Sequence, residues 1–469
     1  MGDVGSVTGQ RRAFAWTLCL TYFVLAILYN ALTPIGEAPD EIGHFEYVDV
    51  ILAERRLPAR EDQLWQGHQA PLYYLAQAAW SRAILVASGC RVERSELPNR
   101  ISPTFMRSPN FNRLEHGRSE RLGSWGCLEW SFHLLRLLST VITLPTILFT
   151  FAILREAAPD TPAIAAVGAT LAALPPSHVA ITAMLNNDAL VNLLIVATTY
   201  LVIRASRTGE PRDFATAVAT GAVAATAKLS ALYLFGLVAL APVLSRDLRA
   251  RLAVSSRGRA WVAAALLVLA LPLLLLVRNW AEWGDLFGVG ALERNLVDLI
   301  AGGANPPSHG ILRYYLVEMP KLFAEGSLVA FGAVNFRFGG SFEAARWVSW
   351  LIGAGLLLGL FVRGVWRHVR TGPLLILVAG FALFFLTYLY PGYRYRWLQA
   401  RYFFNQLPVV SLVAAVAILN LRHALAQLGP SVPDRVVVAF VYAALVALNL
   451  LVLYEGVVAH LYRYVGRSG

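Results

Sequence analysis

The sequence predicts an all-α polytopic membrane protein with about eleven transmembrane helices, because apolar runs of membrane-spanning length follow one another along the chain. Hydrophobic residues make up 57% of the 469 residues and charged residues only 15%. Mean hydropathy is +0.55. Soluble domains carry about 25% charged residues. The composition therefore fits a chain whose main solvent is lipid.

The apolar runs give the predicted spans in order. We place them at residues 13–33, 131–153, 162–181, 187–204, 213–228, 229–245, 260–277, 346–363, 373–390, 404–421 and 436–455. Segments 213–228 and 229–245 abut without a polar loop. The first span follows two arginines, but its apolar run is longer than a signal-peptide core and has no small-residue cleavage site, so we expect it to be retained.

The charge balance indicates topology. Lys and Arg number 40 and Asp and Glu 29, for a net charge of +11, yet no nucleic-acid-binding motif is present. Arginines occupy every short loop on one predicted side, at 155–161, 204–213, 245–259, 363–372 and 422–435. By the positive-inside rule this side and the N-terminus are cytoplasmic. We expect membrane lipids, and no nucleic acid, as partners of the excess charge.

Two long loops then face outward, 34–130 and 278–345, within a single integral-membrane domain covering residues 1–469. The first loop carries two amphipathic patterns, at 42–55 and 70–87, that predict helices lying on the membrane plane.

Two of the three cysteines, Cys90 and Cys127, fall in the first loop. They form a disulfide if the loop faces an oxidising compartment. The alternative is two unrelated thiols, and the sequence does not decide between them.

The polar sequence Asp40-Glu41-x-x-His44 directly after the first span is the strongest functional signal. On a helix beginning at Asp40 the three side chains lie on neighbouring turns. Such a set suits proton abstraction or the binding of a divalent cation (Mg or Mn) by Asp40, Glu41 and His44. The alternative is ordinary capping, with Asp40 as N-cap and Glu41 beside the helix dipole. Capping accounts for one acid but not for the whole set.

The same loop carries a second candidate site, His68 and Tyr73, on either side of Pro71. Pro71 suits the first turn of a helix. His68 is a candidate ligand for phosphate or metal, or a residue of a hydrated loop, and Tyr73 is a candidate substrate contact.

Polar residues at the outer ends of later spans complete the candidates for substrate binding. Asn187 and Asp188 precede the fourth span, where a helix N-terminus either binds an anion or is simply capped. Lys228, Arg278 and Arg401 lie at other outer ends. They are interfacial anchors or ligands of a phosphate, for which a guanidinium is well shaped.

Together these landmarks resemble GT-C glycosyltransferases, the superfamily that includes protein O-mannosyltransferases and lipid A aminoarabinose transferases. The sequences that carry the resemblance are Glu37-Ala38-Pro39-Asp40-Glu41-Ile42-Gly43-His44-Phe45, His68-x-x-Pro71-Leu72-Tyr73-Tyr74, Asn187-Asp188, Arg278-Asn279-Trp280 with Gly284-Asp285, and Arg401-Tyr402-Phe403 followed by Pro408.

The resemblance implies a helical bundle under an outward-facing cavity and a polyprenyl-phosphate sugar as donor. Asp40 then matches the catalytic acid and Glu41 its partner. It also implies a hexosyl- or pentosyltransferase in a bacterial inner or plasma membrane. Its active site is extracytoplasmic, and its acceptor is a hydroxyl of a glycan, lipid or protein.

The residue chemistry agrees with an inverting displacement in which Asp40 is the general base and Arg401 or Lys228 stabilises the leaving phosphate. Two alternatives stay open. The chain is instead a transporter or flippase of a lipid-linked saccharide, using the acids as a coupling site, or a non-catalytic subunit of an envelope glycan assembly complex.

Overall fold

Long apolar helices make up most of the fold. The computed structural model describes residues 4–98, 114–288, 310–320, 330–331, 336–337, 353–362, 364–395 and 400–454. In chain order its helices, 3₁₀ or π turns (η) and strands are α1 (Val4–Leu32), α2 (Glu41–Glu54), η1 (Arg60–Asp62), α3 (Leu72–Ser88), η2 (Arg94–Glu96), η3 (Arg118–Glu120), α4 (Cys127–Ala157), α5 (Pro162–Ala173), α6 (Pro176–Thr182), α7 (Asp188–Thr208), α8 (Pro211–Ala227), η4 (Leu229–Tyr233), α9 (Leu234–Leu244), α10 (Arg246–Val254), α11 (Ser256–Leu267), α12 (Ala270–Trp283), α14 (Ile311–Arg313), η5 (Tyr314–Glu318), β1 (Ala330–Phe331), β2 (Phe336–Arg337), η6 (Trp366–His368), α17 (Thr371–Tyr395), η7 (Ala400–Gln406), α18 (Leu407–Leu425) and α19 (Asp434–Val452).

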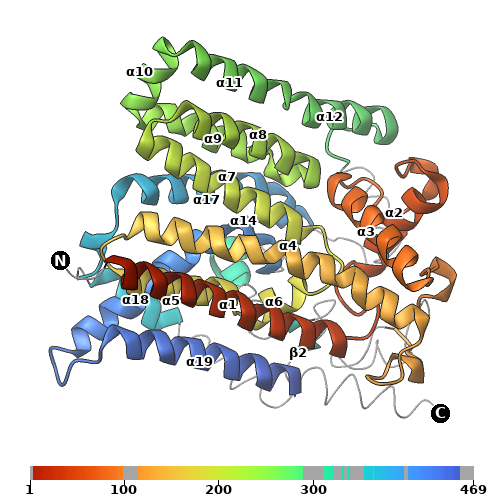
Figure 1. Cartoon of the computed structure of the whole chain (residues 1–469), viewed down its shortest axis with the longest axis horizontal. Helices are drawn as coiled ribbons and strands as arrows, with labels where there is room; N and C mark the ends of the chain where they lie inside the picture. The colour runs from red at the N-terminus through yellow and green to blue at the C-terminus, as the bar shows by residue number, and fades with distance from the viewer. Residues whose placement is uncertain are drawn as a thin grey trace.

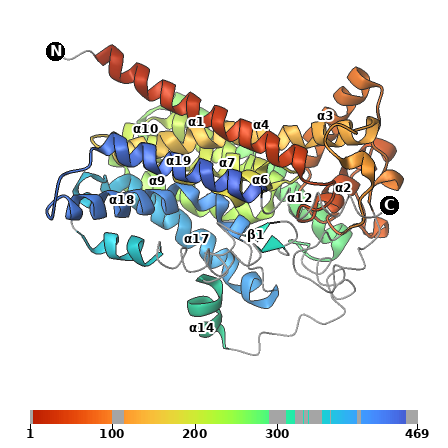
Figure 2. The same cartoon turned by 90° about the horizontal axis from the view of Figure 1, so that it is seen from below.

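The long helices lie side by side in a bundle (Figures 1 and 2). Helix α7 packs against α8, α4 and α9, and α5 packs against α18, α4 and α19. Alanine, valine and leucine side chains fill the core between them. The two-residue strands β1 and β2 pair antiparallel, with Ala330 opposite Arg337.

The prediction of a polytopic all-α membrane protein is confirmed. Within the described residues, seven helices are long and apolar enough to cross a membrane, or up to nine if each of two bent pairs is one span. The seven correspond to the predicted spans 13–33, 131–153, 187–204, 260–277, 373–390, 404–421 and 436–455. The predicted span 346–363 is described only over residues 353–362, and most of the outer loop 278–345 lies outside the described residues. The number eleven therefore stays a prediction.

Three predicted spans differ from single straight helices. Segment 162–181 is broken into α5 and α6, which meet at 57°, because Pro175 and Pro176 interrupt the backbone hydrogen bonding there. Segment 229–245 begins with the turn η4, continues as α9 and then bends by 90° into α10. The helix predicted at 260–277 continues to Trp283, with a break between α11 and α12.

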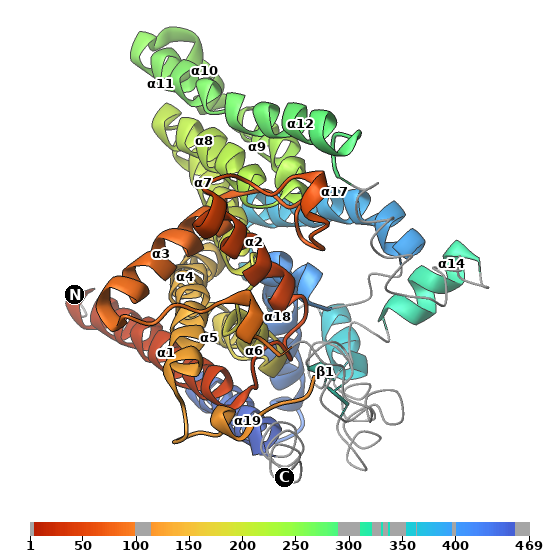
Figure 3. The ribbon, with the colours of Figure 1, turned by 90° about the vertical axis from the view of Figure 1, so that its right-hand side faces the viewer.

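Both helices predicted in the first loop are present as α2 and α3, and Figure 3 shows them across one end of the bundle. Their shared core contains Phe45, Tyr47 and Tyr74, and it continues onto α4 through Phe132 and Leu135. The loop helices are therefore fixed to the bundle by apolar packing. Their position relative to a membrane plane stays a prediction.

The structure joins Cys90, after α3, to Cys127 at the start of α4 by a disulfide. The bond closes a segment with a sequence separation of 37 residues. Reduction, or replacement of both cysteines by serine, should lower the stability of the first loop by roughly 2–4 kcal/mol. Thermal unfolding and limited proteolysis with and without dithiothreitol measure the effect. The double serine variant, the control, should not respond to dithiothreitol, and an unresponsive wild type would contradict the bond.

The first loop is also held by an ionic cluster, the His116 clasp, in which His116 lies between two carboxylates. This cluster should make the stability of the protein depend on pH. Both ring nitrogens of His116 lie 2.8 Å from carboxylate oxygens, one from Glu37 and one from Glu120. Burial lowers the pKa of His116, but hydrogen bonds to Glu120 and Glu37 outweigh it and raise the pKa to about 9. This stabilisation should be complete below about pH 6.5, the pKa of an unfolded histidine, and be lost as pH rises through about 9.

The melting temperature measured between pH 6 and 10 tests the His116 clasp. The wild type should lose stability across this range, and His116→Gln should lose less. Parallel profiles of the two proteins would show that the clasp does not contribute.

Candidate active site

The carboxylate of Asp40 forms an ion pair with Arg401, at the opposite end of the chain. Asp40 Oδ2 lies 2.5 Å from Arg401 Nη2. Asp40 precedes α2 with φ 63° and ψ 5°, in the left-handed region, and its side chain makes no capping hydrogen bond. Aspartate is one of the few non-glycine residues that tolerate this backbone. The capping alternative therefore does not describe Asp40.

Asp40 remains the accessible member of its pair. Its side chain is 31% exposed, whereas that of Arg401 is 6% exposed. Arg401 Nε is buried without a hydrogen-bond partner among the described residues. A buried donor without a partner is costly, so the Arg401 guanidinium has capacity for a further ligand.

A second ion pair lies near the first, and the cations of both pairs lie near the ring of Tyr402. Lys228 Nζ lies 2.5 Å from Asp188 Oδ1. The ring centroid of Tyr402 lies 5.8 Å from Lys228 Nζ and 5.1 Å from the guanidinium carbon of Arg401. The ring face therefore attracts both cations. The residue before α2, the start of α7, the α8–η4 junction and η7 thus contribute to one polar cluster.

His44 and Asn187 border this cluster through Tyr74. His44 Nδ1 lies 2.9 Å from the Tyr74 hydroxyl, which also accepts a 3.4 Å hydrogen bond from Asn187 Nδ2. The Tyr74 ring stacks on that of Tyr47 at 3.8 Å between centroids. His44 and Asn187 are thereby held in fixed orientations beside the ion pairs.

The electrostatics fix the charge state at neutral pH. Burial raises the pKa of Asp40, but the charge and the hydrogen bond of Arg401, the charge of Lys228 and the interaction with His44 at low pH together lower it below its usual value. Burial lowers the pKa of His44 to about 4, despite the nearby carboxylates of Asp40 and Asp188. Asp40 is therefore ionised and His44 neutral at pH 7. The cluster can accept a proton at Asp40 and offer two cations to an anion.

Glu41, predicted as a catalytic partner of Asp40, has its carboxylate turned into the protein. Arg136 Nε and Nη2 donate to its two oxygens at 2.8 and 2.7 Å. The amides of Gly36 and Leu185 donate to the same oxygens. Both side chains of this ion pair are fully buried. Glu41 thus has four donors and no exposed oxygen, which fits a structural role better than the predicted catalytic one.

Tyr73 is likewise satisfied within the protein. Its ring is fully buried, and its hydroxyl lies 2.8 Å from Ser139 Oγ and accepts a hydrogen bond from the Asn186 amide. It anchors α3 to α4 and to the start of α7. A direct substrate contact fits Tyr73 less well than it fits Tyr74.

The other two candidates, His68 and Arg278, are not members of the two ion pairs. His68 is 8% exposed, its Nε2 lies 3.3 Å from Gln69 Nε2, and Lys228 is among the charges that act on it. Arg278 Nη2 donates to the carbonyl of Pro58 and so ties α12 to the first loop. The structure does not join Arg278 to the two ion pairs.

The three candidate metal ligands do not converge. Asp40 faces Arg401, Glu41 faces Arg136 and the His44 nitrogen Nδ1 faces Tyr74. In the part of the chain that is described, no group of three His, Cys, Asp or Glu side chains is placed to hold a metal ion. As placed here, Asp40, Glu41 and His44 therefore do not form the predicted divalent-cation site, and no catalytic step is derived through a metal.

Three residues with clear roles were not among the predicted site residues. Tyr74 and Tyr402 lie inside the sequences that carry the resemblance, so their position was a usable signal. Arg136 had no such signal, because it lies in the apolar helix α4, 95 residues from its partner Glu41.

A model of one known protein family matches part of the chain. Residues 128–276 match the model of the dolichyl-phosphate-mannose-protein mannosyltransferase family. No curated protein matches the sequence significantly.

Solved structures were also compared. ArnT from Cupriavidus metallidurans bound to undecaprenyl phosphate is 14% identical, with a TM-score of 0.44 over 98% of this chain and 75% of that one. The arabinosyltransferase EmbB from Mycobacterium smegmatis is 14% identical, with a TM-score of 0.43 over 96% and 37%. The Archaeoglobus fulgidus oligosaccharyltransferase is 12% identical, with a TM-score of 0.39 over 95% and 54%. Likenesses this weak say nothing of individual residues.

The family model covers about a third of the chain, and over residues 128–276 it agrees with the resemblance to the GT-C superfamily. The apolar spans and this partial family match are findings on which the function proposed below rests.

Proposed function

We propose that the protein transfers a hexosyl or pentosyl group from a polyprenyl-phosphate donor to an acceptor hydroxyl, with inversion at the anomeric carbon. The observation that carries this proposal is the pair of ion pairs around Tyr402. Asp40 supplies an ionised carboxylate, and Arg401 and Lys228 supply two cations. A base for the hydroxyl and cations for the leaving phosphate are the two requirements of the reaction.

The proposed reaction exchanges the partners of Arg401. The donor phosphate binds Arg401 and Lys228, and Arg401 releases Asp40. Without that neighbouring positive charge the pKa of Asp40 rises, so the carboxylate becomes a stronger base. The acceptor oxygen then attacks the anomeric carbon while Asp40 takes its proton. The bond from the anomeric carbon to the phosphate oxygen breaks, and polyprenyl phosphate leaves with the electron pair.

The surrounding residues orient the sugar in this proposal. Asn187, Tyr74 and His44 form a hydrogen-bonded group beside Asp40, and such groups select a sugar by its hydroxyl pattern. Because burial keeps His44 neutral, it can both donate and accept a hydrogen bond. The acceptor, a glycan, lipid or protein hydroxyl, approaches Asp40 from its exposed side.

We infer an extracytoplasmic site in a bacterial inner or plasma membrane, with the N-terminus in the cytoplasm. The disulfide between Cys90 and Cys127 lies in the loop that carries Asp40, and disulfides persist in oxidising compartments. The arginine-rich short loops support the same orientation.

Binding of the leaving group tests the phosphate contacts separately from transfer. Purified protein in lipid nanodiscs should bind polyprenyl phosphate, and Lys228→Gln should weaken binding about tenfold, because one charge-assisted contact is worth about 1.5–3 kcal/mol. Arg207→Gln, which changes an arginine paired with Glu156 outside the cluster, is the control. Equal binding of polyprenyl phosphate by wild type and Lys228→Gln would remove Lys228 from the site. Equal binding of the uncharged polyprenol by the wild type would remove the phosphate contact altogether.

A further inference from the structure

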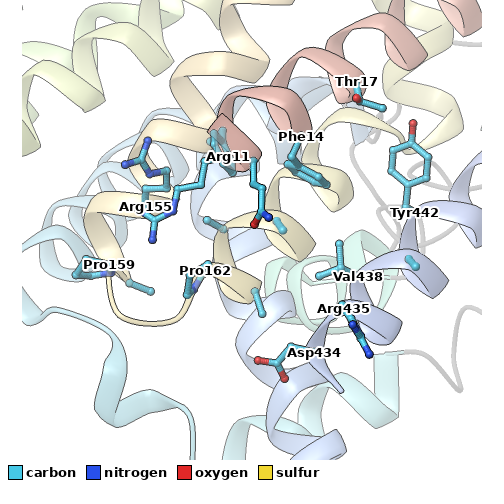
Figure 4. A pocket seen from close by; sticks show the side chains of 17 residues that line it. Arg11, Phe14, Thr17, Arg155, Pro159, Pro162, Asp434, Arg435, Val438 and Tyr442 are labelled. Carbon is cyan, nitrogen blue, oxygen red and sulfur yellow. The ribbon is translucent and has the colours of Figure 1, made fainter. Parts of the chain in front are cut away.

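A cavity lies at the end of the bundle away from α2 and α3 (Figure 1). Its volume is about 660 Å³, and its walls come from the start of α1, the end of α4, the start of α5 and the start of α19. Figure 4 shows side chains from α1, α4 and α19 around it. None of the polar residues described above as the candidate active site lines this cavity, so it needs a separate explanation.

Three arginines surround the cavity, one from each of α1, α4 and α19: Arg11, Arg155 and Arg435. Among the described residues, no acidic side chain forms an ion pair with any of the three. The one acid in the lining, Asp434, forms an ion pair with Arg422 at 3.1 Å. The lining therefore carries an excess of positive charge that the described part of the protein does not neutralise.

The walls between these charges are largely apolar. Phe14, Phe151 and Val438 line the cavity together with several alanines. The guanidinium of Arg155 lies over the ring of Phe151, 5.9 Å from its centroid, so an apolar surface and a cation adjoin directly. A small hydrated anion would gain little from such walls, whereas an acyl chain gains free energy by contacting them.

We propose that this cavity binds the headgroup and proximal acyl chain of an anionic phospholipid. Arginines bind phosphate oxygens with well-matched geometry, and basic pockets between transmembrane helices bind anionic headgroups. The bound lipid bridges α1, α4 and α19, which contribute one arginine each. The proposal is independent of the sugar-transfer reaction, since it concerns a structural ligand at the other end of the bundle.

Lipid titration of the full-length protein tests this proposal. Delipidated protein in neutral detergent is titrated with dioleoyl phosphatidylglycerol or dioleoyl phosphatidylcholine, and bound lipid is counted by native mass spectrometry. Phosphatidylglycerol should bind more tightly. Arg11→Gln should weaken its binding about fivefold and replacement of all three arginines about a hundredfold, at about 1 kcal/mol for each charge.

The neighbouring arginine provides a matched control. Arg12 is an exposed residue on the same helix and does not line the cavity, so Arg12→Gln removes the same charge and should leave binding unchanged. Ala439→Trp fills the cavity while keeping every arginine, and it should also block phosphatidylglycerol binding.

Three results would overturn the proposal. The first is equal weakening by Arg11→Gln and Arg12→Gln, which would indicate attraction to bulk charge. The second is equal binding of phosphatidylcholine. The third is displacement of phosphatidylglycerol by millimolar inorganic phosphate, which would indicate a site for a free anion. Because the Ala439→Trp protein retains all charges, its result remains decisive even if the triple variant does not fold.

Discussion

Replacing Asp40 by asparagine should lower the rate of sugar transfer about a thousandfold, because a positioned general base contributes roughly 10²–10⁴ to a rate. The substitution keeps the size of the side chain, and asparagine tolerates the left-handed backbone at φ 63° as well as aspartate does. The loss should appear in kcat rather than in KM, since the proton is transferred only in the transition state.

The matched control is Asp49→Asn, on the helix α2 that Asp40 precedes. Asp49 is partly exposed, and its nearest cation is Arg91, at 3.8 Å. This variant should transfer sugar at close to the wild-type rate. A folded Asp40→Asn protein with undiminished kcat would show that the base lies elsewhere.

The largest effect on stability should come from Arg136→Met. Arg136 is fully buried, and beyond its two bonds to Glu41 it donates to the carbonyls of Asn30, Thr33 and Pro34. Removing it leaves the buried Glu41 carboxylate without its cation, which costs about 3–5 kcal/mol. The segment from the end of α1 to the start of α2, which positions Asp40, should lose its order first.

A double-mutant cycle separates the lost pair from the lost volume. Glu41→Gln combined with Arg136→Met should recover part of the loss, because no unpaired charge is then buried. Arg204→Met serves as a control, since Arg204 is itself exposed in its ion pair with Asp213. Its replacement should cost less than about 1 kcal/mol. Equal melting temperatures for Arg136→Met and Arg204→Met would contradict the structural role of the buried pair.

Much of the candidate site follows from the sequence because its residues stand at the ends of apolar segments. Asp40, Asp188, Lys228 and Arg401 are each conspicuous there, since charge at a membrane-spanning segment needs a partner or a task. Their positions predict polar groups at one end of the bundle. Which acid meets which cation depends on helix packing, and no spacing in the sequence encodes it.

The adjacent acids Asp40 and Glu41 show where residue type alone is insufficient. The left-handed backbone at Asp40 turns its side chain toward Arg401, while the first helical turn directs Glu41 inward to Arg136. Arg136 was not predicted because an arginine within an apolar helix reveals neither its depth nor its partner. The helix break at Pro175 and Pro176 was also missed, because residues 162–181 were predicted as one span. Here the sequence did carry a signal, since consecutive prolines rarely continue a helix.

The most direct measurement is sugar transfer by the purified protein in lipid, using a panel of radiolabelled polyprenyl-phosphate sugars. The account predicts that label from at least one donor moves to an acceptor, or is released to water, with wild type and not with Asp40→Asn. If every donor stays intact while the wild-type protein binds one of them tightly, the proposed transfer from a polyprenyl-phosphate donor is wrong. Transport of a lipid-linked saccharide would then be the better-supported function.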